Sequence, residues 1–110
     1  MNYIDFEDGN KAYKLRLNTR AIIALEKQLG CNPLAIFGDG NTIPTITAMV
    51  SILHASLQQY NHGITLNDAF DIFDAFLADG HAMTDFIPVI VDIYKVSGII
   101  KNEEESEKNA

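Results

Sequence analysis

Residues 43–60 constrain the fold most, because they carry a helical pattern over eighteen residues without one charged side chain. Their large apolar residues recur at the spacing of a single helical stripe: Ile46, Met49, Val50, Leu53, Leu57 and Tyr60. The other positions are mostly small and all uncharged, so the second side of the helix also suits burial. We therefore expect a helix that is packed on most sides at the centre of a small bundle.

A β-hairpin is predicted at the N-terminal end, over about residues 2–17. Its second strand, residues 12–17, alternates apolar and basic side chains, which is the period-two pattern of a half-buried strand. Asp8-Gly9 tolerates the positive φ angles of a tight turn after the first strand, residues 3–6. Because a two-stranded hairpin is marginal alone, its apolar face should lie against helices.

A first helix is expected from Asn18 or Thr19, either of which can cap it, to about Leu29, where Gly30 ends it. Ile22, Leu25 and Leu29 form its inward side. Residues 33–37 add one further helical turn. The central helix follows, with Pro44 in its first turn.

The helix after the central one has the clearest start, because Thr65 and Asp68 have the spacing of a capping box. It ends at Gly80. Its expected buried residues are Leu66, Ala69, Phe70, Phe73, Phe76 and Leu77. We interpret the aromatic row of Phe70, Phe73 and Phe76 as core, with a groove for a partner as the alternative.

The last helix is expected from about Asp85 to Ser97, with Pro88 in its first turn. Its main stripe is formed by Ile87, Ile90, Val91 and Tyr94. Further β-branched residues widen the apolar surface beyond what one core face needs. Plain burial is one interpretation, and self-association or docking onto another helix is the other. Under the second interpretation, the partner-binding residues are Ile93, Val96, Ile99 and Ile100.

These elements together predict a mainly α protein (α+β) with a bundle of about four helices and a short N-terminal β-hairpin. Residues 1–100 are expected to form a single domain, and 110 residues suffice for one modest core. The acidic end, residues 101–110, is predicted to be a disordered tail, because it has too little apolar area to offset the entropy of ordering.

Charge and composition narrow the classes of function. A formal net charge of −7 repels a phosphate backbone, so we expect no nucleic-acid partner. The single cysteine, Cys31, cannot form an internal disulfide, which fits a reducing compartment. The sequence shows neither a signal peptide nor an apolar run approaching ~18 residues. We expect a cytoplasmic protein with no membrane partner.

No residue pattern indicates an active site, a metal site or a cofactor site. Three aspartates at positions 68, 71 and 74 are interpreted as an exposed helix face rather than a catalytic or metal cluster. The histidines at 54, 62 and 81 match no zinc signature. The glycine-rich residues 38–41 lack the pattern of a phosphate-binding loop. We expect a protein that is not an enzyme and has no cofactor.

Several segments resemble the tail assembly chaperones of long-tailed phages (siphoviruses) and prophages of Gram-positive bacteria. These segments lie at residues 13–17, 25–30, 32–34, 53–65 and 83–98, within a match from about residue 11 to 100. The resemblance implies a non-enzymatic factor of the host cytoplasm that is absent from the mature virion. Such a factor binds and solubilises the tape measure protein and helps recruit subunits of the tail tube protein.

The resemblance also implies a short form and a longer, frameshifted form. Glu107-Lys108-Asn109 can be encoded GAA-AAA-AAC, which contains a heptamer on which paired tRNAs can slip back one base. A second such site is Ile100-Lys101-Asn102. We hypothesise a programmed frameshift whose product carries a second domain for the tail tube protein, the alternative being that Lys-Asn pairs are common in AT-rich genomes.

Two other classes of function stay open. One is a structural virion protein of the phage tail or connector, which would remain in the particle. The other is a small-molecule-binding or catalytic domain, which would need a buried polar pocket.

Overall fold

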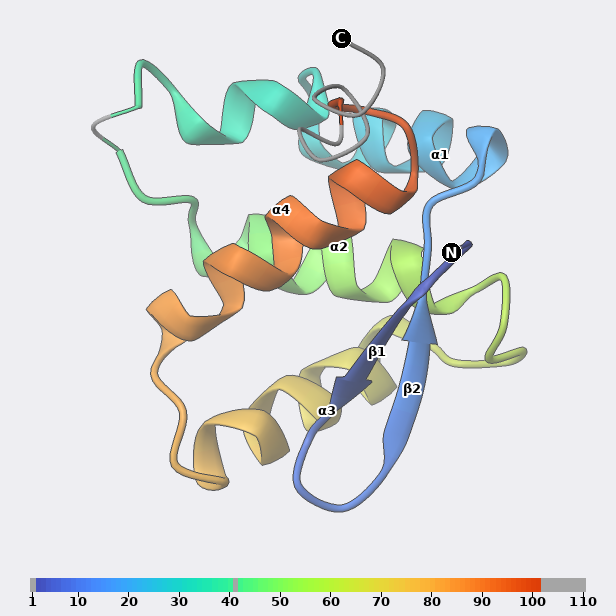
Figure 1. Ribbon diagram of the computed structural model, residues 1–110, viewed down its shortest axis with the longest axis vertical. Coiled ribbons are helices and arrows are strands. Elements are labelled where there is room, and N and C mark those ends of the chain that lie inside the picture. Colours follow the sequence, from blue (N-terminus) through green and yellow to red (C-terminus); the bar gives the residue numbers. More distant parts are fainter. Residues whose placement is uncertain (1, 41, 102–110) are drawn as a thin grey trace, which may run out of the picture.

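The computed structural model describes residues 2–40 and 42–101 (Figure 1). Strands β1 (Ile4–Glu7) and β2 (Ala12–Leu15) pair as an antiparallel hairpin. The α-helices are α1 (Thr19–Leu29), α2 (Ile46–Leu57), α3 (Leu66–Ala78) and α4 (Phe86–Val96), and the short 3-10 helices are η1 (Pro33–Phe37) and η2 (Met83–Asp85). The predicted fold class, a bundle of about four helices with a short N-terminal hairpin, is confirmed.

Helix α2 is the centre of the bundle. α1 and α3 lie on opposite sides of it, and α4 and the hairpin pack across a third side (Figure 1). Nine residues of α2 are buried, including the small residues Ser51, Ala55 and Ser56. The predicted central helix, packed on most sides, is therefore present.

Helix α2 is shorter than the predicted stretch. Thr45 is its N-cap and accepts a hydrogen bond from the Ala48 N–H (3.1 Å), so Pro44 precedes the helix instead of lying in its first turn. The ends of the predicted buried stripe, Ile46 and Tyr60, are exposed. Ile46 is the first helical residue and Tyr60 lies beyond the last, so neither faces the core.

The hairpin packs its apolar face against α3 and α4, as predicted. The Phe6 ring lies 5.2 Å from that of Phe76 and 5.7 Å from that of Phe86. At the tip, the Asp8 carboxylate accepts hydrogen bonds from two backbone N–H groups, and Gly9 has φ 96°. A Cβ at Gly9 would come within 2.6 Å of Asp79 Cγ, so glycine lets the tip approach the end of α3.

Strand β2 ends two residues earlier than predicted because its next backbone donors have partners outside the sheet. The Arg16 N–H donates to the Ser56 carbonyl oxygen (2.9 Å). The Leu17 N–H donates to Ser97 Oγ (2.9 Å), and Leu17 itself is fully buried. These two bonds fix the end of the hairpin to α2 and to the turn after α4.

The predicted helix caps are confirmed. Asn18 is the N-cap of α1 and accepts a hydrogen bond from the Ala21 N–H (2.9 Å), and Gly30 ends the helix with φ 73°. Thr65 and Asp68 form the complete capping box of α3, with bonds of 2.9 and 3.1 Å.

The predicted inward faces of α3 and α4 need correction. Phe70 was assigned to the core but is exposed, whereas Ile72 is buried. In α4 the buried residues are Phe86, Ile90, Ile93 and Tyr94, so the stripe is rotated from the predicted one. The cause is Phe86, whose ring packs against those of Phe6, Phe73 and Phe76 and turns that side of α4 inward.

Tyr94 joins α4 to the segment after α1. Its ring is fully buried, and its hydroxyl donates a hydrogen bond to the Pro33 carbonyl oxygen (2.9 Å). Burial raises the pKa of the Tyr94 hydroxyl well above its ordinary value, so the group remains a donor at all physiological pH values.

The substitution Tyr94→Phe should lower the free energy of unfolding by about 0.5–1.5 kcal/mol, because it removes a buried hydrogen bond to the Pro33 carbonyl oxygen. Urea denaturation measures the difference. Tyr60→Phe is the matched control and should have little effect, since the Tyr60 side chain is exposed. Equal effects of the two substitutions would contradict the structural role of the Tyr94 hydroxyl.

The capping box makes a prediction about pH. Hydrogen bonds with Thr65, first from its backbone N–H and then from its side chain, hold the pKa of Asp68 below its ordinary value. The unfolded chain therefore takes up this proton at a higher pH than the folded chain, and the contribution to stability is lost as pH falls through the lowered pKa.

Asp68→Ala should accordingly lower the melting temperature at pH 7, and the difference from wild type should shrink as pH falls below about 4. Thermal unfolding followed by circular dichroism between pH 7 and 2 checks this, with the exposed Asp71→Ala as control. A difference that is constant over the whole pH range would argue against the carboxylate as its source.

Candidate partner-binding surfaces

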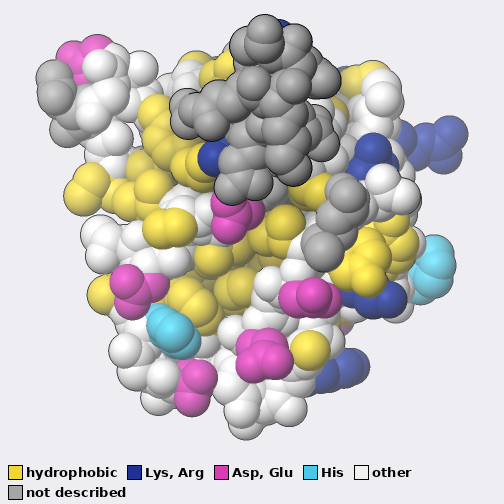
Figure 2. All heavy atoms as spheres, in the orientation of Figure 1, with side chains coloured by type: hydrophobic (Ala, Val, Ile, Leu, Met, Phe, Trp, Pro, Cys, Tyr) yellow, Lys and Arg dark blue, Asp and Glu magenta, His cyan; other side chains and the backbone are white. Residues whose placement is uncertain are grey.

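The C-terminal residues predicted to bind a partner differ in their exposure. Ile93 is 0% exposed, so it is a core residue and does not belong to an accessible surface. Val96, Ile99 and Ile100 are half-buried. Figure 2 shows hydrophobic side chains gathered across the middle of the face that carries α4, with acidic side chains between them.

The turn after α4 is held firmly to the bundle. The backbone N–H groups of Ile99 and Ile100 both donate to the Tyr94 carbonyl oxygen, at 2.9 and 3.4 Å, and both side chains pack against the core. Their contact with another chain stays a prediction. The predicted disordered tail, except for Lys101, lies outside the described residues, and so do the frameshift site at Glu107-Lys108-Asn109 and Asn102 of the second site.

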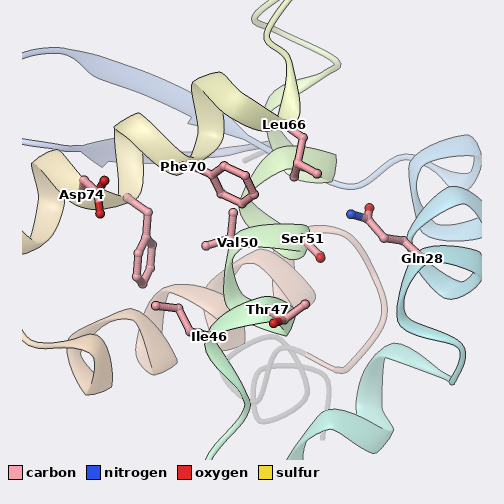
Figure 3. Close-up of a pocket in the computed structure, with 9 residues that line it drawn as sticks. Gln28, Ile46, Thr47, Val50, Ser51, Leu66, Phe70 and Asp74 are labelled. Atoms are coloured by element: carbon pink, nitrogen blue, oxygen red, sulfur yellow. The ribbon is translucent and has the colours of Figure 1, made fainter.

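The structure places a hollow between α2 and α3, lined by Phe70 and Phe73 of the aromatic row whose alternative interpretation is a groove for a partner. Its volume is about 390 Å³ (Figure 3). Ile46 and Phe70, each 45% exposed, come from the two helices that form it, and Gln28 of α1 completes it. The remaining lining residues are Thr47, Val50, Ser51, Leu66 and Asp74.

Two further hollows adjoin the first. One, of about 470 Å³, lies between α1 and α2 and is lined by Ala21, Ala24, Gln28, His54 and Ala55 among others. The other, of about 260 Å³, lies at the start of α2 and includes the 57% exposed Ile43. Gln28 lines all three hollows, so they adjoin one another at this residue.

We call these three adjoining hollows together the α2 groove. Its floor is the outward side of α2, formed by Ile46, Thr47, Val50, Ser51, His54, Ala55 and Gln58. These residues recur every three or four positions and none is charged. The floor combines Ile46 and Val50 of the predicted apolar stripe with residues of the small, uncharged side of the helix, which was also expected to be covered.

Two signals pointed to the groove. Phe70 extends the apolar side of α3 beyond the buried residues Ala69 and Phe73. Residues 43–60 lack charge on both sides of the helix. The sequence favours burial for both signals and leaves a partner groove at the aromatic row as the alternative, because a sequence alone cannot separate coverage by the same chain from coverage by a partner.

The titratable residues singled out in the sequence do not form one site in the described part of the chain. Asp68, Asp71 and Asp74 are exposed, and Asp74 borders the α2 groove. His81 stacks on the Phe76 ring at 4.2 Å, 3.8 Å from each of two aspartates. Over residues 2–40 and 42–101, no group of three or more His, Cys, Asp and Glu side chains is placed to hold a metal ion.

None of the helices in the described part of the chain has the length and apolar character needed to cross a membrane.

The burial of Ile93 can be tested directly. Ile93→Ala should lower the free energy of unfolding by about 2–5 kcal/mol, the usual cost of truncating a core aliphatic residue. Ile43→Ala, at an exposed position, should change it by about 0.5 kcal/mol or less. Urea denaturation compares the two, and a small effect at Ile93 would show that this residue is not core.

Comparison with known proteins gives one finding. A family model described as a family of unknown function (DUF6096) matches residues 4–110. No curated protein and no solved structure matches the chain. The family match begins at β1 and includes every helix described above. The chain therefore belongs to the family of unknown function DUF6096.

Proposed function

We propose that this chain is a non-enzymatic tail assembly chaperone of a long-tailed phage or prophage. It binds and solubilises the tape measure protein in the bacterial host cytoplasm, helps recruit tail tube subunits, and is absent from the mature virion. The family match leaves function open. The proposal therefore rests on the segments that resemble such chaperones, and on where those segments lie.

The observation that carries the proposal is that two of these segments border the same surface. Residues 25–30 supply Leu25 and Gln28, and residues 53–57 supply His54 and Ala55, to the hollow between α1 and α2. The resemblance thus includes residues of a surface depression as well as residues of the core. A shared partner-binding role requires such surface residues, and Gln28 and His54 are the ones that reach the hollow without belonging to the buried core.

The chemistry of the groove also suits a chaperone. Protein interfaces are depleted of charge at their centre and enriched in aromatic residues, and the α2 groove combines an uncharged floor with the exposed ring of Phe70. A net charge of −7 keeps a complex of this protein with an apolar partner soluble through repulsion between complexes.

Co-expression tests the proposal. The tape measure protein encoded with this chain should be mostly insoluble when expressed alone, and should become soluble and co-purify when the two are expressed together. An unrelated acidic helical protein of similar size, expressed to the same level, is the control. A tape measure protein that is equally soluble in all three conditions would remove the main support for the chaperone.

Mass spectrometry of purified phage particles separates the chaperone from a structural virion protein. A chaperone should be undetectable there beside the tail tube protein, whereas stoichiometric amounts would assign the chain to the tail or connector. The codons of the gene test whether a longer, frameshifted form is made. Synonymous codons that break both heptamers would exclude a frameshift at these sites as the source of a second domain for the tail tube protein.

A further inference from the structure

We infer that the α2 groove binds an amphipathic helix of a partner protein, and that this helix places Lys or Arg side chains along the α3 edge of the groove. The inference specifies the binding surface and the chemistry of the partner. Its identification with a helix of the tape measure protein rests on the function proposed above.

The shape of the groove favours a helix. α1 and α3 both run antiparallel to α2 and form the two walls, and the three hollows follow the axis of α2 rather than forming one enclosed cavity. The twelve residues of α2 span about 18 Å, which is room for roughly three turns of a bound helix. A ligand that fits this space is elongated.

The backbone of the groove also argues against an extended peptide. Its floor and walls are α-helices, whose backbone hydrogen bonds are already made within each helix. A bound strand would find no free sheet edge there for its own N–H and C=O groups, whereas a bound helix satisfies these groups internally. The groove therefore offers side-chain contacts, which is what an amphipathic helix requires.

The groove has apolar contacts on both walls. On the α3 side, Ile46 and Phe70 form an exposed apolar pair, and a half-exposed aromatic ring in a hollow is a typical anchor of an interface. On the α1 side, Ala21 and Ala24 are small and leave space for large side chains from the partner. A helix with leucine-sized residues at spacings of three and four would fill both sides.

The charges around the groove determine which sign of charge the partner should carry along each edge. Asp74 lines the α3 edge, and Asp71, three residues earlier, is on the same exposed side of that helix. The floor between the walls is uncharged. Arg20 is at the opposite end, beside His62. Cationic side chains are therefore favoured along the α3 edge, and complementary charges of this kind select and orient partners.

The test uses a fluorescein-labelled helical peptide of about 18 residues, with leucines at spacings of three and four on one face and lysines along one edge. A matched peptide carries glutamates in place of the lysines. Fluorescence anisotropy at 0.15 M salt should give a Kd at least ten-fold lower for the lysine peptide. Phe70→Ser should weaken its binding at least ten-fold, and Ile46→Ser is a second variant at the same hollow.

Charge reversal tests whether the two aspartates at the α3 edge select a cationic partner. The double variant Asp71→Lys and Asp74→Lys should weaken binding of the lysine peptide and strengthen binding of the glutamate peptide. The matched control, Asp5→Lys and Asp92→Lys, makes the same change in net charge at exposed positions away from the groove and should leave the preference unchanged. Circular dichroism confirms that each variant is folded.

Three outcomes would overturn the inference. The lysine peptide fails to bind, or it binds with an affinity that the groove variants do not alter, or sedimentation velocity shows a dimer that Phe70→Ser dissociates. The last result would assign the groove to a second copy of the chain. Peptide binding without solubilisation of the tape measure protein would support the groove as a binding site and contradict the proposed chaperone function. Solubilisation without peptide binding would show that the tape measure protein binds at another surface.

Discussion

The burial of α2 is the interaction on which the rest of the structure depends. Met49, Ile52, Leu53 and Leu57 are fully buried, and the hairpin and every other α-helix pack against this element. Each such side chain contributes roughly 1.5–3 kcal/mol of transfer free energy. The absence of charged residues allows α2 to be buried on most sides, because burying one unpaired charge would cost far more free energy than one apolar side chain contributes. It also leaves the fourth side of α2 uncharged where that side faces the groove.

The elements that were predicted correctly from the sequence are those whose ends are set by hydrogen bonds between residues close together in the chain. Asn18 and Gly30 delimit α1, and the capping box of Thr65 and Asp68 starts α3, through bonds that span three or four residues. Such signals need no knowledge of the remaining fold. The end of β2 is different, because its donors bond to Ser56 and Ser97, which are far away in the chain, and no local pattern indicates this.

The faces of the helices were harder to predict than the helices themselves. Periodicity identifies a stripe, but α4 is apolar on more than one side, and its orientation is decided by Phe86, which joins rings from the hairpin and α3. The same limit explains why periodicity alone did not separate the residues of the α2 groove from core residues. Phe70 and Ile46 satisfy the periodic pattern of core residues, yet they line a groove, whereas Ile93 lies outside the predicted stripe of α4 and is core.

The hydrogen bond from the Leu17 N–H to Ser97 Oγ joins positions that are 80 residues apart. During synthesis, the hairpin and α1 leave the ribosome long before Ser97 is made, so the end of β2 lacks this partner throughout most of translation. The hairpin also waits for Phe86 to complete its ring cluster. The hairpin therefore completes its contacts only after α4 and the turn that follows it have been made.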